Sequence, residues 1–219
     1  MSDYNRAAKC YWAALVAAGA CALAWGVYHC LFFAPVEWAR LLVLASLVVI
    51  SGFYPVRIPG TKASVTVGDC FVFLGIIFLG VQAGVVLGAL DLFTSSVRTS
   101  RRVTSWVAAP AASAVTGCVA GRLFYLALAA DGVARHPVGW TQALPLGQLI
   151  LPLVLMALAQ YLVNGVLVAT LLALKSRRSI WAYWRDGYLW TSWTFFAGAL
   201  AAGLVYAAIM RFGVASVIL

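Results

Sequence analysis

The chain has 219 residues, of which 64% are hydrophobic and only 10% are charged, and its formal net charge is +9. Soluble globular domains are about 45–50% apolar and about 25% charged, so this composition excludes an ordinary soluble enzyme and a disordered chain. The basic residues fall between apolar stretches and do not follow one exposed face, which argues against a nucleic-acid-binding module. We therefore expect an all-α integral membrane protein, built as a single domain over residues 1–219 and embedded in the lipid bilayer.

Seven apolar stretches predict transmembrane helices, because a helix that crosses a bilayer needs about 20 mostly apolar residues. The expected spans cover residues 10–33, 38–53, 67–80, 82–97, 103–130, 148–174 and 190–210. The apolar run over residues 69–97 is long for one span and short for two, so the total lies between six and eight. A tight reversal around Gly80 would turn this run into a glycine-rich helical hairpin.

The distribution of Lys and Arg separates a single crossing from a hairpin in residues 69–97. With a cytoplasmic N-terminus and a hairpin, eleven of the fifteen basic residues lie in cytoplasmic segments. A single crossing would place Arg98 and Arg101 on the opposite side from Arg57. Cytoplasmic loops are enriched in Lys and Arg, so the hairpin is favoured. This topology predicts a multi-pass protein of a bacterial inner membrane, with a cytoplasmic N-terminus and an external C-terminus.

The N-terminus and the five cysteines add few constraints. Arg6 and Lys9 precede an apolar run as in a signal peptide, but the run continues to Phe33, which is long for one. We expect a retained first helix, with cleavage before Cys21 as the minor alternative. The cysteines lack the spacing of metal ligands, so we expect small packing residues, no metal and no cofactor.

Two neighbouring spans each carry a row of small residues four positions apart. The rows are Gly80, Gly84 and Gly88 in the fourth span, and Ala109, Ser113, Gly117 and Gly121 in the fifth. Small residues mark the faces where helices approach closely in lipid. We therefore expect the two rows to pack against each other within one chain. A homodimer formed through the same rows is the alternative.

Ionisable residues inside spans are costly and are therefore candidates for functional sites. Asp91 lies about 10 Å from the expected cytoplasmic edge, given the rise of an α-helix. Gln160 and Asn164 lie four residues apart on one face of the sixth span, and Asp69 begins the third span in the same half of the bilayer. These four residues predict a polar cluster that either binds a small ligand or fixes the bundle through hydrogen bonds.

Motifs of catalysis are absent from the sequence. It contains no GxSxG, HExxH or P-loop motif, and no paired carboxylates with a nearby base. We therefore expect no enzymatic activity, which leaves binding, transport and structural functions.

Three stretches carry a family resemblance. They are Val56-Arg57-Ile58-Pro59-Gly60 followed by Val65-Thr66-Val67-Gly68-Asp69, then residues 161–169, and then Trp184-Arg185-Asp186-Gly187-Tyr188-Leu189-Trp190-Thr191. With the apolar runs between them they resemble the N-terminal multi-helix membrane sensor region of bacterial signalling proteins whose output is an HD-type phosphohydrolase or a diguanylate cyclase. The sequence departs from this pattern near the start of the fifth span, where residues 106–110 lack an expected Asn. It also shows no output domain, so signalling would require a protein partner.

The resemblance and the polar cluster together favour a sensor-like membrane domain. It would bind a small or apolar ligand among spans three to six and act through a separate partner. The alternative is a transport component, either a substrate-binding subunit of an importer or a small secondary transporter. A glycine-rich hairpin after a Pro-Gly loop also resembles the substrate-binding subunits of vitamin importers. A purely structural membrane protein is the third hypothesis.

Overall fold

The computed structural model describes residues 5–53, 56–57, 64–65, 67–130, 144–176, 179, 181 and 192–213. In these ranges the chain is helical apart from a pair of two-residue strands, which confirms the predicted all-α class. The helices are α1 (Arg6–Cys30), α2 (Pro35–Phe53), α3 (Gly68–Leu79), α4 (Val81–Thr99), α5 (Val103–Ala130), α6 (Leu146–Ser176) and α8 (Ser192–Phe212). Strands β1 (Val56–Arg57) and β2 (Ser64–Val65) pair antiparallel.

Five of the helices, α1, α2, α5, α6 and α8, are long and apolar enough to cross a membrane. Helix α3 is apolar but has only 12 residues, about 18 Å of helix against a hydrocarbon core of about 30 Å. Helix α4 has 19 residues and carries Asp91 and several hydroxyl side chains. The helices are therefore compatible with a membrane protein, whereas the total of seven crossings remains a prediction.

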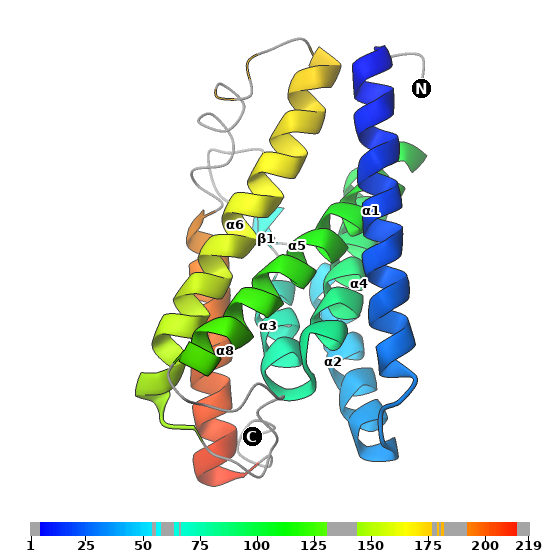
Figure 1. Ribbon diagram of the computed structural model, residues 1–219. Coiled ribbons are helices and arrows are strands. Elements are labelled where there is room, and N and C mark those ends of the chain that lie inside the picture. The colour runs from blue at the N-terminus through cyan, green and yellow to red at the C-terminus, as the bar shows by residue number, and fades with distance from the viewer. Residues whose placement is uncertain are drawn as a thin grey trace.

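Helices α4 and α5 form the central pair of the bundle (Figure 1). Helix α1 packs against both of them, α2 covers α3 and α4, and α6 and α8 close the opposite side against α5 and α3. The start of α1 lies beside the end of α6, where Asn5 Nδ2 donates a hydrogen bond to the Leu174 carbonyl oxygen at 2.9 Å. The α3–α4 turn and the end of α8 lie toward the opposite end of the bundle (Figure 1).

The turn between α3 and α4 consists of the single residue Gly80. Its φ of +97° lies in the region that favours glycine, and the residue is buried. The last carbonyl groups of a helix have few backbone donors, and in α3 the Gly80 N–H donates to the Ile76 oxygen at 3.1 Å. Tyr125 Oη on α5 donates to the Ile76 oxygen at 2.5 Å, and Gln82 Nε2 donates to the Leu79 oxygen at 2.9 Å. Side chains from two neighbouring helices therefore stabilise the end of α3.

The faces of α4 and α5 that carry small residues lie against each other. A Cβ at Gly117 would lie 3.5 Å from the Gly84 carbonyl oxygen, so the two backbones are nearly in contact. A Cβ at Gly121 would lie 3.0 Å from Val81 Cγ1. Gly84 also touches the third helix, since a Cβ there would lie 2.1 Å from Ile76 Cγ1. Glycine at position 84 therefore lets α4 approach α3 and α5 at once.

Replacing Gly84 with Leu should destabilise the monomer by about 1–3 kcal/mol, because the new side chain would overlap Ile76 in a packed interior. Unfolding in detergent, with the oligomeric state measured in parallel by light scattering, checks this. Gly147→Leu is the matched control, since a Cβ at Gly147 meets nothing within 4 Å. A Gly84→Leu variant that keeps its monomer stability and loses only a dimer would contradict the internal contact.

Replacing Tyr125 with Phe should lower the free energy of unfolding by about 0.6–2 kcal/mol, the range of interhelical hydrogen bonds in membranes. The variant keeps the ring but removes the donor to Ile76, leaving a carbonyl at the end of α3 with one partner fewer. The same unfolding assay applied to Tyr28→Phe, at an exposed position on α1, serves as control. Equal stability changes in the two variants would refute this role for Tyr125.

Candidate functional site

The candidate site is formed by two aspartates that meet at the start of α3. Asp69 lies in the first turn of α3, and Asp91 lies on α4 with only 1% of its surface exposed. The Asp91 carboxyl group rests directly on Gly68, because a Cβ at position 68 would lie 2.2 Å from Asp91 Oδ1. The two carboxyl groups are close enough to repel each other electrostatically. We call Asp69 and Asp91 the aspartate pair.

Asp91 lies in the interior of the bundle, whereas Asp69 in the first turn of α3 is partly buried. Asp91 is about 15 Å along α4 from Val81 and about 12 Å from Thr99, given a rise of 1.5 Å per residue. The pair therefore lies near the middle of α4, surrounded by apolar helices. This position follows from the lengths of the two helices, since α3 is too short to carry Asp69 back to the end of the bundle where α4 ends.

Glycines form the walls of the site on two sides. Gly68 leaves room for the Asp91 carboxyl group, and Gly198 on α8 faces Asp69, where a Cβ would lie 3.1 Å from Asp69 Cβ. Helices α3, α4 and α8 therefore converge on the pair, with no large side chain at these two positions. A change in the charge of the pair would act directly on the spacing of three helices.

The electrostatics of the site favour binding of one positive charge. The first backbone amides of α3 provide a partial positive charge that stabilises one carboxylate. Two adjacent carboxylates in a medium of low dielectric constant repel each other strongly, and such pairs typically share one proton. The aspartate pair can therefore hold a proton, a small cation or the amino group of a ligand.

Ser113 on α5 adds a buried hydroxyl group one helical turn below Asp91. Its side chain is 2% exposed, and its Oγ has no hydrogen-bond partner among the described residues. The hydroxyl faces Gly88, where a Cβ would lie 2.8 Å from Ser113 Oγ, and Gly88 shares a face of α4 with Asp91. From the sequence alone, Ser113 is expected to be only a small packing residue. One feature of the sequence could have indicated this position. Ser113 is a hydroxyl residue within a row of small residues that was expected to pack against the span with Asp91.

Gln160 and Asn164, the other two predicted members of the cluster, lie on α6. This helix packs mainly against α5 and α8. Gln160 is 4% exposed, and its Oε1 has no hydrogen-bond partner in the described ranges, whereas Asn164 is half-buried. No hydrogen bond joins either side chain to an aspartate within these ranges. The structure thus brings Asp69 and Asp91 together and places Gln160 and Asn164 on a neighbouring helix.

Other polar groups offer no second site of this kind. Within the part of the chain that the structure describes, no group of three His, Cys, Asp or Glu residues could hold a metal ion. Arg122, on the outer surface of α5, places its guanidinium group 5.5 Å from the centre of the Trp25 ring on α1. This contact joins two helices at the surface of the bundle.

Comparisons of the chain with protein-family models, with curated proteins and with solved structures find no match.

Proposed function

We propose that this chain is a multi-pass protein of a bacterial inner membrane that binds a small ligand at the aspartate pair and acts, as a sensor, through a separate protein partner. The observation that carries this proposal is the packing of the buried Asp91 carboxyl group against Gly68, the neighbour of Asp69, within a largely apolar bundle. The resemblance to membrane sensor regions of bacterial signalling proteins supports the same function.

The chemistry of the pair favours a ligand over a purely structural role. Hydroxyl and amide side chains can join helices by hydrogen bonds at little electrostatic cost, but two neighbouring carboxyl groups repel each other. Ionisable residues inside membrane segments usually serve ligands, ions or protons for this reason. A compensating positive charge would relieve the repulsion between Asp69 and Asp91 and stabilise the contacts among α3, α4 and α8.

The packing of α8 provides a route from the site to a partner. Gly198 places the backbone of α8 against the first turn of α3, so a change at the pair would displace α8. Helix α8 then runs to Phe212 at the opposite end of the bundle (Figure 1). A partner that contacts α8 or its neighbour α6 would therefore sense whether the site is occupied.

A transport component is the second candidate, and one feature of the structure favours it. Helix α3 is short, and its N-terminus lies beside the middle of α4, where Asp91 packs against Gly68 next to Asp69. Transporter binding sites are typically built from such discontinuous helices near the middle of the membrane. The substrate would then be the species that neutralises the aspartate pair.

The basic residues support a cytoplasmic location for the end of the bundle where α1 begins. The starts of α1 and α5 and the ends of α4 and α6 lie toward this end (Figure 1). The described basic residues near these helix ends are Arg6, Lys9, Arg98, Arg101, Arg102 and Lys175. Under the positive-inside rule this end faces the cytoplasm, and α3 and α4 then form the predicted hairpin within a topology of seven spans.

Single cysteines introduced by Thr61→Cys and Ser100→Cys, in a chain without its five native cysteines, should both react with a membrane-impermeant thiol reagent from the cytoplasmic side. Labelling of inside-out and right-side-out vesicles measures this. Ala34→Cys, between α1 and α2 at the other end of the bundle, should label from the opposite side. Labelling of positions 61 and 100 from opposite sides would rule out the hairpin.

Native mass spectrometry of the protein, extracted gently from its own membrane, should detect a small-molecule ligand or a signalling enzyme with the wild-type chain. Asp91→Asn should reduce retention of a positively charged ligand by at least about 30-fold, because it removes a buried charge partner. Glu37→Gln, a charge removal at the partly exposed start of α2, should leave retention unchanged.

The identity of the retained species separates the hypotheses. A bound ATPase or transmembrane coupling subunit would identify a transport component and contradict the sensor proposal. Equal ligand retention by the wild type and Asp91→Asn would overturn the assignment of the site. A wild-type chain with bulk lipid alone would favour a purely structural protein.

A further inference from the structure

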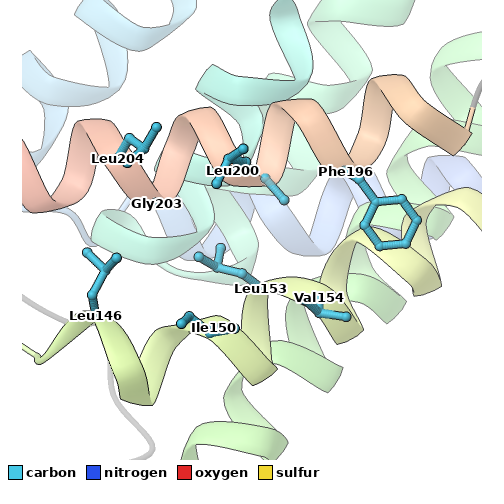
Figure 2. Close-up of a pocket in the computed structure, with 9 residues that line it drawn as sticks. Leu146, Ile150, Leu153, Val154, Phe196, Leu200, Gly203 and Leu204 are labelled. Atoms are coloured by element: carbon cyan, nitrogen blue, oxygen red, sulfur yellow. The ribbon is translucent and has the colours of Figure 1, made fainter.

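An apolar groove lies between α6 and α8, on the side of the bundle away from α1 (Figures 1 and 2). Its volume is about 130 Å³. All of its lining side chains are apolar, and Figure 2 shows those of α6 and α8 approaching each other across the groove. The lining residues include Ile150, Leu153 and Val154 from α6 and Phe196, Leu200 and Leu204 from α8.

The groove opens to the outside of the bundle. Leu200 is 65% exposed, Leu204 57% and Ile150 55%. Both helices are long and apolar enough to cross a membrane, so this opening would face lipid. Gly203 forms part of the floor, where a Cβ would lie 3.0 Å from Leu153 Cδ1 and would narrow the groove. The surface thus offers an apolar slot to the surrounding acyl chains.

The dimensions of the groove match a single acyl chain. It follows α8 from Phe196 to Leu204, about 12 Å of helix, which is most of the length of one leaflet of the hydrocarbon core. An acyl chain is flexible and apolar along its whole length, which suits an open groove with an entirely apolar lining. A flexible hydrocarbon chain aligned with α8 therefore fits this groove.

A positive charge lies at the end of this groove. Arg211 falls on the same face of α8 as Leu200 and Leu204, about 10 Å beyond Leu204 toward the helix end. Its side chain is exposed, and neither α6 nor α8 contains an acidic residue. Basic side chains near a membrane surface attract anionic headgroups. The guanidinium group lies 5.6 Å from the centre of the Phe212 ring at the exposed end of α8, within reach of the headgroup of a lipid whose chain follows α8.

We propose that the groove between α6 and α8 binds one acyl chain of an anionic phospholipid, whose phosphate contacts Arg211. The proposal shares with the proposed function only the location in a membrane, and it does not depend on the aspartate pair. Because α8 lines the groove and also contacts Asp69 through Gly198, the bound lipid would hold α8 against α6.

Native mass spectrometry of the full chain tests this proposal, with phosphatidylglycerol and phosphatidylcholine of equal chain length added to the delipidated protein. The wild type should retain one phosphatidylglycerol in preference to phosphatidylcholine. Arg211→Gln should reduce this preference about five-fold, as expected for one basic side chain near the headgroup. Arg101→Gln, between the end of α4 and the start of α5, should not change the occupancy of this lipid.

Two variants that fill the groove test the position of the chain. Gly203→Leu should lower the retention of both lipids. Leu200→Trp should have the same effect and, because position 200 is exposed, it can be tested if Gly203→Leu does not fold. Ala24→Leu adds apolar bulk to the exposed face of α1 and should leave retention unchanged. Wild-type retention in the groove-filling variants would overturn the proposal, as would equal binding of the two lipids.

A photo-crosslinking amino acid at position 204 identifies the occupant in the native membrane. An adduct with the mass of a phospholipid supports the proposal. An adduct with another protein, or with a second copy of the chain, would show that the groove is a protein interface and would overturn it.

Discussion

A helix that ends inside an apolar environment must find donors for its last carbonyl groups, and α3 depends on this condition. Gly80 allows the chain to reverse in one residue, while Tyr125 and Gln82 bond the carbonyl groups of Ile76 and Leu79. The donor from α5 also fixes α3 against the centre of the bundle. Without these bonds the Leu79 oxygen would lose its side-chain donor, and the Ile76 oxygen would keep only the Gly80 N–H.

The position of the aspartate pair follows from the position of the C-terminal end of α3. Because α3 contains only 12 residues, its first turn lies beside the middle of α4, not beside the end of α4. Gly84 and Gly68 then let α3 and α4 approach closely enough for Asp91 to reach the N-terminus of α3. A charged site beside the middle of α4 thus results from the length of one short helix and the absence of side chains at two positions.

Helix α8 connects the two sites proposed for this protein. One of its faces meets Asp69 through Gly198, and another lines the groove through Leu200 and Gly203. A shift of α8 would therefore change both the surroundings of the aspartate pair and the shape of the lipid-facing groove. This arrangement offers a physical connection between an interior ligand and the outer surface of the bundle, in a sensor or in a transport component.

The sequence by itself determined the helical class and the apolar segments, because hydropathy over about 20 residues depends only on composition. The sequence also identified Asp69 and Asp91 as ionisable residues within apolar segments, where a charge is unfavourable in free energy. Charge and local hydropathy can both be read from the sequence. The tertiary structure places Asp91 against the first turn of α3 beside Asp69, and it shows that α6, which carries Gln160 and Asn164, packs mainly against α5 and α8. An apolar face has the same residue types whether it contacts lipid or another helix. The sequence therefore does not show which helices are neighbours, whereas the packed structure does. For the same reason the sequence did not predict the hydrogen bond from Tyr125 or the groove beside Gly203. Both depend on contacts between residues that are distant in the chain.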